Sequence, residues 1–220
     1  MKNPFKADDL SRIRAAVAEA EGRTSGEIVP YMVERSGRYE LAIWRGAVVL
    51  AVITLAVVVF AHQFYTGWSI AWPFTGWGAA LLALIGGTLG ALAAWLVAPL
   101  RRWLAGPSLL DRTVHQRALE AFVEEEVFAT RERTGILLFI SLFEHRIEVL
   151  GDSGINELVS ADDWADVVLR VREGIRSGRV TEGVLEAIEM CGHLLERKGV
   201  ELRPDDTDEL GNEMRFKKGS

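Results

Sequence analysis

The longest stretch without a charged side chain lies in the middle of this chain. Residues 46–100 form a run of 55 residues with no Asp, Glu, Lys or Arg, although the whole sequence contains 31 acidic and 25 basic residues. All the charge is therefore confined to the two flanking segments. This division predicts two structurally different parts, and it excludes an ordinary soluble enzyme, a transporter with most of its mass in lipid and a disordered chain.

Two segments of the uncharged stretch are long enough to cross a membrane. A transmembrane helix needs about 20 consecutive apolar residues, and residues 46–64 and 77–98 both meet this requirement. The residues between them include Gly, Pro, Ser and several aromatic residues, which favour a turn at the membrane surface. The sequence thus predicts a transmembrane helical hairpin within residues 41–103, in contact with the lipid bilayer.

Basic residues on both sides of the hairpin predict its orientation. Lys and Arg close to a membrane span are retained in the cytoplasm. The relevant residues are Arg35, Arg38 and Arg45 before the first span and Arg101 and Arg102 after the second. We therefore expect a multi-pass protein of the plasma (inner) membrane with both termini in the cytoplasm.

The charged segments together predict one α/β domain that the hairpin interrupts. Apolar residues at helical spacing predict helices at 7–22, at 110–131, after the capping box Ser160–Asp163 and at 181–198; apolar runs predict strands at 27–34, 136–142 and 146–150. We expect a small mixed sheet of three to four strands flanked by helices. Its two parts would be residues 1–40 and 104–202, followed by a flexible tail at 203–220. The acidic run Glu124–Glu126 is interpreted as a solvated helix face.

Several features of the second charged segment resemble a known family. They are Thr134-Gly135 before the buried strand, Arg146-Ile147-Glu148-Val149 followed by Gly151-Asp152-x-Gly154-Ile155, and Gly178-x-x-x-x-Gly183-Val184-x-x-Ala187-Ile188. Residues 133–195 resemble the TPM domain, named from a thylakoid lumen protein, a photosystem II repair factor and a modulator of acetylcholine receptors. The resemblance implies an α/β domain that serves a membrane complex, and also an acid phosphatase activity reported for a plant member. Family members commonly look like secreted or lumenal domains with one anchoring helix, so the inserted hairpin is a departure.

Four aspartates form the candidate metal site. Asp162, Asp163 and Asp166 lie within about one helical turn of one another, and Asp152 follows the strand at 146–150. Carboxylate oxygens are the ligands that Ca²⁺ and Mg²⁺ prefer. The alternative is that these aspartates only cap helix N-termini and complement the helix dipole. Both interpretations stay open at the level of the sequence.

Small residues recur every four positions in the second apolar segment, at Gly86, Gly90 and Ala94. This spacing lets two helix backbones approach closely in lipid. The row predicts an interface, either with the first span of the same hairpin or with a second copy of the chain.

These observations favour a non-enzymatic integral membrane protein whose cytoplasmic domain is an assembly, repair or regulatory partner of a membrane complex. Two alternatives stay open: a metal-dependent acid phosphatase using the carboxylates above, and a homo-oligomeric membrane scaffold. A net charge of −6 without clustered basic residues argues against a nucleic-acid partner. The sequence contains no recognisable set of nucleophile, base and orienting residue.

Overall fold

The computed structural model describes the chain except residues 1–4, 65–70, 203–204, 206–208 and 218–220. The chain divides into two compact units. Met1–Gly37 and Asp111–Ser220 form the first unit, and Arg38–Leu110 form the second. The first unit is therefore built from two segments that are far apart in the sequence.

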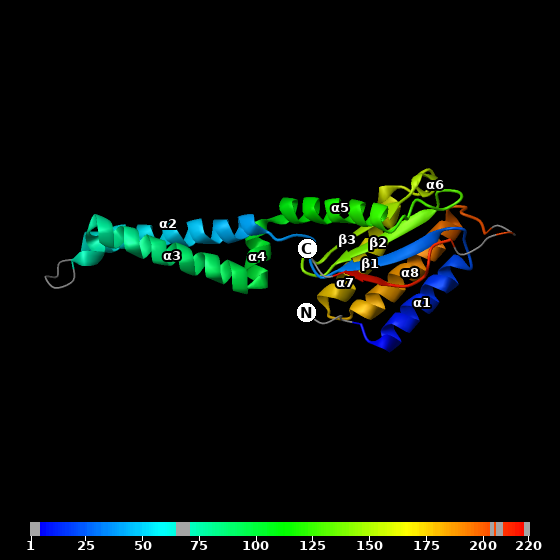
Figure 1. The fold of residues 1–220 in the computed structure, drawn as a ribbon, viewed down its shortest axis with the longest axis horizontal. Coiled ribbons are helices and arrows are strands. Elements are labelled where there is room, and N and C mark those ends of the chain that lie inside the picture. The colour runs from blue at the N-terminus through cyan, green and yellow to red at the C-terminus, as the bar shows by residue number, and fades with distance from the viewer. Residues whose placement is uncertain (1–4, 65–70, 203–204, 206–208, 218–220) are drawn as a thin grey trace. The chain divides into compact units, whose positions relative to one another are not determined.

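The first unit contains a four-stranded mixed sheet. Its strands are β1 (Glu27–Val33), β2 (Gly135–Ser141), β3 (Arg146–Gly151) and β4 (Arg215–Lys217), in the spatial order β3-β2-β1-β4 (Figure 1). β1 runs parallel to β2 and to β4, whereas β3 runs antiparallel to β2. This arrangement confirms the predicted α/β fold class with a small mixed sheet.

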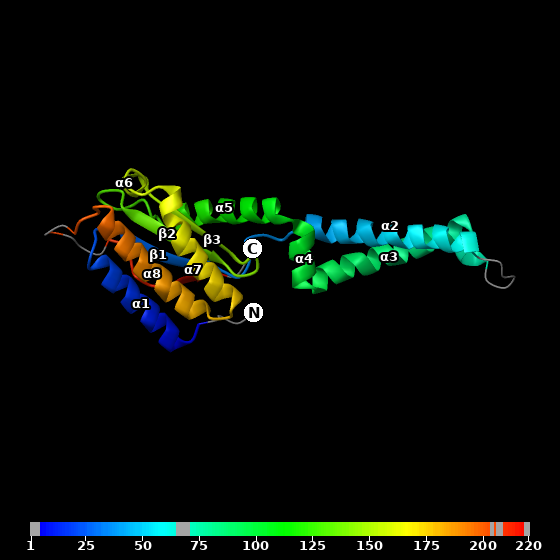
Figure 2. The ribbon, with the colours of Figure 1, turned by 180° about the vertical axis from the view of Figure 1, so that it is seen from behind.

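Helices cover both faces of this sheet. α1 (Ala7–Glu21), α8 (Val180–Arg197) and α7 (Ala165–Arg176) lie side by side on one face, and α5 (Pro107–Glu124) lies on the other (Figures 1 and 2). Two short helices, α6 (Ser153–Asn156) and η2 (Ala161–Trp164), connect β3 to α7. Parallel neighbours such as β1 and β2 need a crossover connection, and this connection contains both the second unit and α5.

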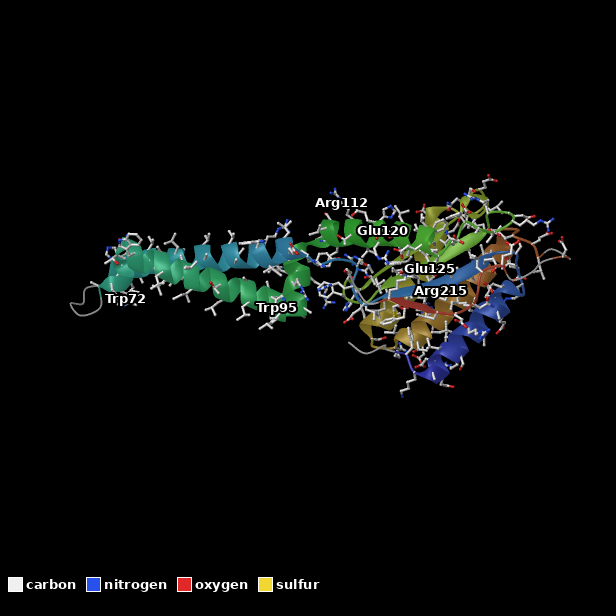
Figure 3. The ribbon with its side chains drawn as sticks, viewed as in Figure 1. Trp72, Trp95, Arg112, Glu120, Glu125 and Arg215 are labelled. Carbon is white, nitrogen blue, oxygen red and sulfur yellow. The ribbon has the colours of Figure 1, made fainter. Side chains whose placement is uncertain are left out.

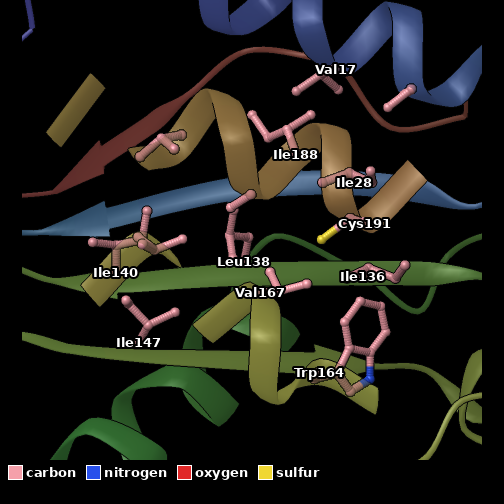
Figure 4. Packing of buried hydrophobic residues seen from close by; sticks show 14 of the residues in the cluster. Val17, Ile28, Ile136, Leu138, Ile140, Ile147, Trp164, Val167, Ile188 and Cys191 are labelled. Carbon is pink, nitrogen blue, oxygen red and sulfur yellow. The ribbon is translucent and has the colours of Figure 1, made fainter. Parts of the chain in front are cut away.

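The central strand β2 is buried on both faces because it lies between two hydrophobic clusters. Ile136, Leu138 and Ile140 face the cluster formed with α1, α7 and α8 (Figure 4), whereas Leu137 and Phe139 face the cluster formed with α5. Successive side chains of a strand point to opposite faces, so a continuous apolar run suits this position. The predicted two-sided burial is confirmed.

The helix predicted to extend to residue 131 is shorter, because α5 ends at Glu124. Glu126 has a φ of 51°, in the left-handed region that interrupts a helix. The turn brings Val127 into the cluster under α5, where it is fully buried. The chain must reverse here to enter β2.

Part of the tail that was predicted to be flexible belongs to the sheet. Residues 215–217 form β4 and pair with Tyr31–Val33 of β1. Phe216 packs against the core cluster on the α1 and α8 side. A three-residue strand with a single aromatic residue carries too little sequence pattern to be recognised before the structure is known.

The second unit is a helical hairpin. It contains α2 (Glu40–Phe64), the short helix η1 (Trp72–Phe74), α3 (Gly76–Leu96) and α4 (Ala98–Ala105). α2 and α3 have 25 and 21 residues and are long and apolar enough to cross a membrane. Trp72 and Trp95 lie near opposite ends of the helix pair (Figure 3). At the base of the hairpin, Arg45 Nη1 donates hydrogen bonds to the carbonyl oxygens of Leu104 and Ala105, at 2.8 and 2.9 Å, and so caps the end of α4.

Candidate functional site

A groove between α7 and α8 contains two of the predicted site residues. The helices meet closely near their connection, where a Cβ atom on Gly174 would lie 2.8 Å from Gly183 Cα. Toward the other end of the pair, two open cavities of about 380 and 390 Å³ share Asp166 and Met190 among their lining residues. Their other lining residues are Asp163, Val167, His193, Leu194, Glu196 and Arg197 in one, and Leu169, Arg170 and Glu173 in the other. The first cavity has an apolar floor, because Val167 and Leu194 are buried, and charged residues surround it; the second cavity is lined mostly by charged residues. A concave surface of this kind suits the binding of another molecule.

Asp163 is fixed by a cap and an ion pair at the edge of this groove. Its Oδ2 accepts hydrogen bonds from Ser160 N at 2.9 Å, Ser160 Oγ at 2.7 Å and Lys198 Nζ at 2.7 Å. The hydrogen bond from Lys198 and those from Ser160 lower the pKa of Asp163 from 3.8 to about 2. The predicted capping box is therefore present, and it joins the start of η2 to the end of α8.

The lowered pKa of Asp163 predicts how an Asp163→Asn substitution changes the pH dependence of stability. A carboxyl group with a lowered folded-state pKa stabilises the fold above its unfolded-state value and loses this contribution as the pH falls through the folded-state value. We expect the variant to unfold at a lower temperature than the unmodified protein at pH 7. The unfolding temperatures of the variant and the unmodified protein should converge as the pH falls from about 4 to about 2.

Thermal unfolding in detergent at a series of pH values measures this difference. Asp162→Asn is the matched control, because Asp162 is an exposed neighbour in the same short helix. A constant difference between Asp163→Asn and the unmodified protein over the whole acid range would contradict the assignment.

Asp152 lies at a different place, where β3 leaves the sheet. It is the N-cap of α6, and its Oδ1 accepts a hydrogen bond from Ser153 N at 2.7 Å. Its Oδ2 lies 2.9 Å from Arg133 Nε, and the Asp152 side chain is only 7% exposed. A cationic side chain therefore already neutralises this carboxylate.

The structure does not bring the four predicted carboxylates together. Asp152 pairs with Arg133 and Asp163 pairs with Lys198, whereas Asp162 and Asp166 are exposed. Within the part of the chain that the structure describes, no group of three or more His, Cys, Asp or Glu side chains could hold a metal ion. A Ca²⁺ or Mg²⁺ site at these aspartates remains a prediction from the sequence.

The predicted small-residue row faces the other long helix of the hairpin. Ala94 is fully buried, and a Cβ atom on Gly46 of α2 would lie 2.9 Å from Ala94 Cβ and 2.8 Å from the Gly90 carbonyl oxygen. Gly86 lies against Thr54 and Leu50 of α2. These contacts support packing within the hairpin, the first of the two interpretations of this row.

A second group of side chains, which sequence reasoning missed, joins α5, β1 and β4. We call it the Tyr31 cluster; its members are Tyr31, Arg117, Glu124, Glu125, Arg215 and Lys217. Arg117 Nη2 donates to Tyr31 Oη at 3.0 Å and to Glu124 Oε2 at 3.1 Å. Lys217 Nζ donates to Glu124 Oε2 at 2.9 Å. Arg215 Nε donates to Glu125 Oε2 at 3.3 Å, and Figure 3 labels these two residues. Two residues of the acidic run at the end of α5 are therefore paired with the tail. Glu124 and Glu126 are exposed, as expected for a solvated face, whereas the Glu125 side chain is only 18% exposed and departs from that interpretation.

The charges of the Tyr31 cluster shift one another's pKa values. Burial raises the pKa of Tyr31, although Arg117 and Lys217 oppose this effect. The hydrogen bonds from Arg117 and Lys217 lower the pKa of Glu124, and the bond to Glu124 raises the pKa of Lys217. The hydrogen bonds within the cluster thus favour the charged forms of Glu124 and Lys217.

A third polar group is buried at the end of β2. Glu144 is 3% exposed and accepts a hydrogen bond from Ser36 N at 2.9 Å and another from Ser141 Oγ. Ser36 Oγ lies 2.7 Å from Ser141 Oγ. These contacts fix the segment that follows β1. The partners Ser36 and Glu144 are 108 positions apart in the sequence, so no local pattern could have revealed them.

The strand order and the helices on both sheet faces define an α/β protein with a TPM-like fold. A comparable solved structure is the NMR structure of the BA42 protein from the psychrophilic bacterium Bizionia argentinensis, with a TM-score of 0.59 and 18% sequence identity. The match covers 99% of this chain and 98% of BA42. At this identity the likeness shows the fold. No family model matches the chain, and no curated protein matches it.

Proposed function

We propose that this protein is anchored in the plasma (inner) membrane by α2 and α3, and that its TPM-like domain recognises a partner protein during assembly, repair or regulation of a membrane complex. The observation that carries the proposal is the apolar surface of α2 and α3, which is exposed along both helices. In water this surface would be a large unpartnered apolar area, whereas in lipid it needs no protein cover.

The aromatic side chains at the two ends of the hairpin support this placement. Trp44 and Phe64 of α2 are 70% and 69% exposed, and the helix rises about 30 Å between them at 1.5 Å per residue, which equals the hydrocarbon thickness of a bilayer. Trp77 and Trp95 are similarly exposed near the two ends of α3. Tryptophan is enriched at both membrane surfaces.

The proposed orientation, with the TPM-like domain in the cytoplasm, predicts which introduced cysteines a membrane-impermeant maleimide reaches. Ala71→Cys, at the hairpin turn, should be labelled in sealed right-side-out vesicles, whereas Ser177→Cys, in the domain, should be labelled only after the vesicles are opened. Both positions are exposed in the structure. The native Cys191 is fully buried and burial raises its pKa to about 12, so the unmodified chain serves as an unlabelled control. Labelling of Ser177→Cys in sealed vesicles would contradict this orientation and indicate that the domain lies outside the cytoplasm.

The groove between α7 and α8 is the part of the domain that we propose for partner recognition. Leu169 is 51% exposed although it lines this groove, and Met190 contributes to both cavities. Exposed apolar side chains within a charged rim are typical of a recognition surface. The carboxylates that a phosphatase would direct at a metal ion are instead paired at Asp152 and Asp163, which favours recognition over hydrolysis.

Site-specific photocrosslinking in native membranes tests this function. A photoreactive amino acid at position 169 should form one discrete adduct with a partner protein. The matched control is position 158, because Leu158 is 47% exposed but lies outside the groove. If both positions formed the same set of adducts, or if position 169 formed none, the groove would not be the recognition surface. Hydrolysis of phosphoesters at enzymatic rates that Asp152→Ala abolishes would instead establish the phosphatase alternative.

A further inference from the structure

We propose that the edge of β1 on which β4 lies, at Tyr31–Val33 and the following Glu34, together with Glu124 and Glu125, is a docking site for an extended basic segment of a partner protein. The chain's own Arg215–Lys217 occupies the site in the isolated protein. This inference deepens the proposed recognition function and rests on it. The site lies on α5 and β1, and not on the groove between α7 and α8.

The edge of β1 is open to another strand over only part of its length. The Ile28 N–H already donates to Glu21 Oε1 at 2.9 Å, and Pro30 has no N–H to donate. Glu34 N donates to Lys217 O at 3.3 Å, and the alternation of a parallel ladder places the N–H of Met32 on the same edge. The first half of the edge is therefore closed, and the second half accepts a short parallel strand.

The side chains of β4 show which chemistry this edge selects. Successive residues of a strand point to opposite sheet faces. Phe216 packs against the apolar cluster on the α1 and α8 side, whereas Arg215 and Lys217 pair with Glu125 and Glu124 on the α5 side. Lys217 Nζ also lies 5.6 Å from the centre of the Tyr31 ring. The site therefore suits a segment in which one aromatic residue lies between two basic residues.

The chain's own strand makes only a short backbone contact with this edge, so a longer segment could compete with it. β4 pairs with β1 through three residues. The side chain of Lys217 is 46% exposed and that of Glu124 is 44% exposed, so their ion pair contributes little in water and is weakened by salt. The backbone of β1 and the carboxylates of Glu124 and Glu125 together suit the addition of a strand. In such a site the backbone hydrogen bonds provide affinity and the alternate side chains provide specificity.

Binding of a labelled peptide tests the proposal. The probe is a fluorescent peptide of residues 212–220, measured by fluorescence anisotropy with detergent-solubilised protein. A chain ending at residue 212 should bind this peptide at least about tenfold more tightly than the full chain, in which the site is occupied. A Phe216→Ala peptide, or a chain with Glu124→Gln and Glu125→Gln, should weaken binding about tenfold.

Two controls make the result decisive. Glu120→Gln should leave peptide binding unchanged, because Glu120 contacts Arg117 of the same helix. If the shortened chain does not fold, the full chain carrying Arg215→Glu and Lys217→Glu replaces it, since like charges should then displace β4. The inference would be overturned if the peptide bound equally well to the full chain and to the chain without β4 in place. It would also be overturned if a folded chain without β4 in place did not bind the peptide. A dimer that exchanges tails and dissociates on truncation would also overturn it. None of these outcomes changes the crosslinking result expected at position 169.

Discussion

A Gly90→Ala substitution is expected to destabilise the helical hairpin by about 2–3 kcal/mol. A Cβ atom at this position would overlap the carbonyl oxygen of Gly46 and approach Leu50 Cβ to 2.8 Å. The backbone of α2 cannot move away as a flexible side chain could, so the two helices must separate. Since packing is the main source of helix association in lipid, this separation removes contacts along much of the interface. Unfolding of the detergent-solubilised chain by SDS, followed by the fluorescence of its tryptophans, measures the effect.

Gly87→Ala is the matched control for this experiment. Gly87 lies in the same helix, but its added Cβ atom would meet Ala47 O and Ala51 Cβ at 3.4 Å, an ordinary contact distance. Alanine is favoured over glycine in a helix by about 1 kcal/mol, so this variant should be as stable as the unmodified chain or slightly more stable. Equal destabilisation by both substitutions would mean that the close approach of Gly46 and Gly90 is not what holds the hairpin together.

The fold could be predicted from the sequence where a local pattern determines the structure. The uninterrupted apolar run of β2 indicated a strand buried on both faces, because only such a position protects Leu137 and Leu138 at once. The capping box at Ser160 and Asp163 was similarly visible, since its hydrogen bonds join residues three positions apart. These features depend on spacing alone.

The contacts that define the candidate sites join residues far apart in the sequence, so the local spacing of residues does not predict them. Arg117 and Tyr31 are 86 positions apart, and their contact depends on α5 crossing the sheet beside β1. The partial burial of Glu125 and the ion pairs of Glu124 and Glu125 could not be predicted, because their partners come from a strand that forms only in the folded sheet. Asp152 and Asp163 resembled parts of one site, but each met a cation from another segment. In each case tertiary structure decided the role of the charge.

The buried carboxylate of Glu144 provides the second large effect. Glu144→Ala is expected to destabilise the first unit by about 2–3 kcal/mol, because it leaves the Ser36 N–H buried without its acceptor and removes one of the two hydrogen-bond partners of the Ser141 hydroxyl. Ser36 and Ser141 are 6% and 0% exposed, so water replaces the carboxylate only if the structure opens. Opening should begin in the segment after β1, which Glu144 holds. Hydrogen exchange followed by mass spectrometry should therefore show faster exchange at residues 34–39 than in β2.

Two further substitutions separate this role from a general effect of charge. Glu144→Gln keeps one acceptor oxygen, so it should recover about half of the lost stability and slow the exchange at residues 34–39 again. Glu148→Ala removes a carboxylate that is 30% exposed and pairs with His115 at 2.8 Å, and it should cost less than about 1 kcal/mol. If Glu144→Gln and Glu144→Ala were equally unstable, the negative charge and not the pair of accepted hydrogen bonds would be the source of the stabilisation. The segment after β1 joins the sheet to α2, so the same exchange measurement shows whether one buried carboxylate orders the chain where it leaves the domain for the hairpin.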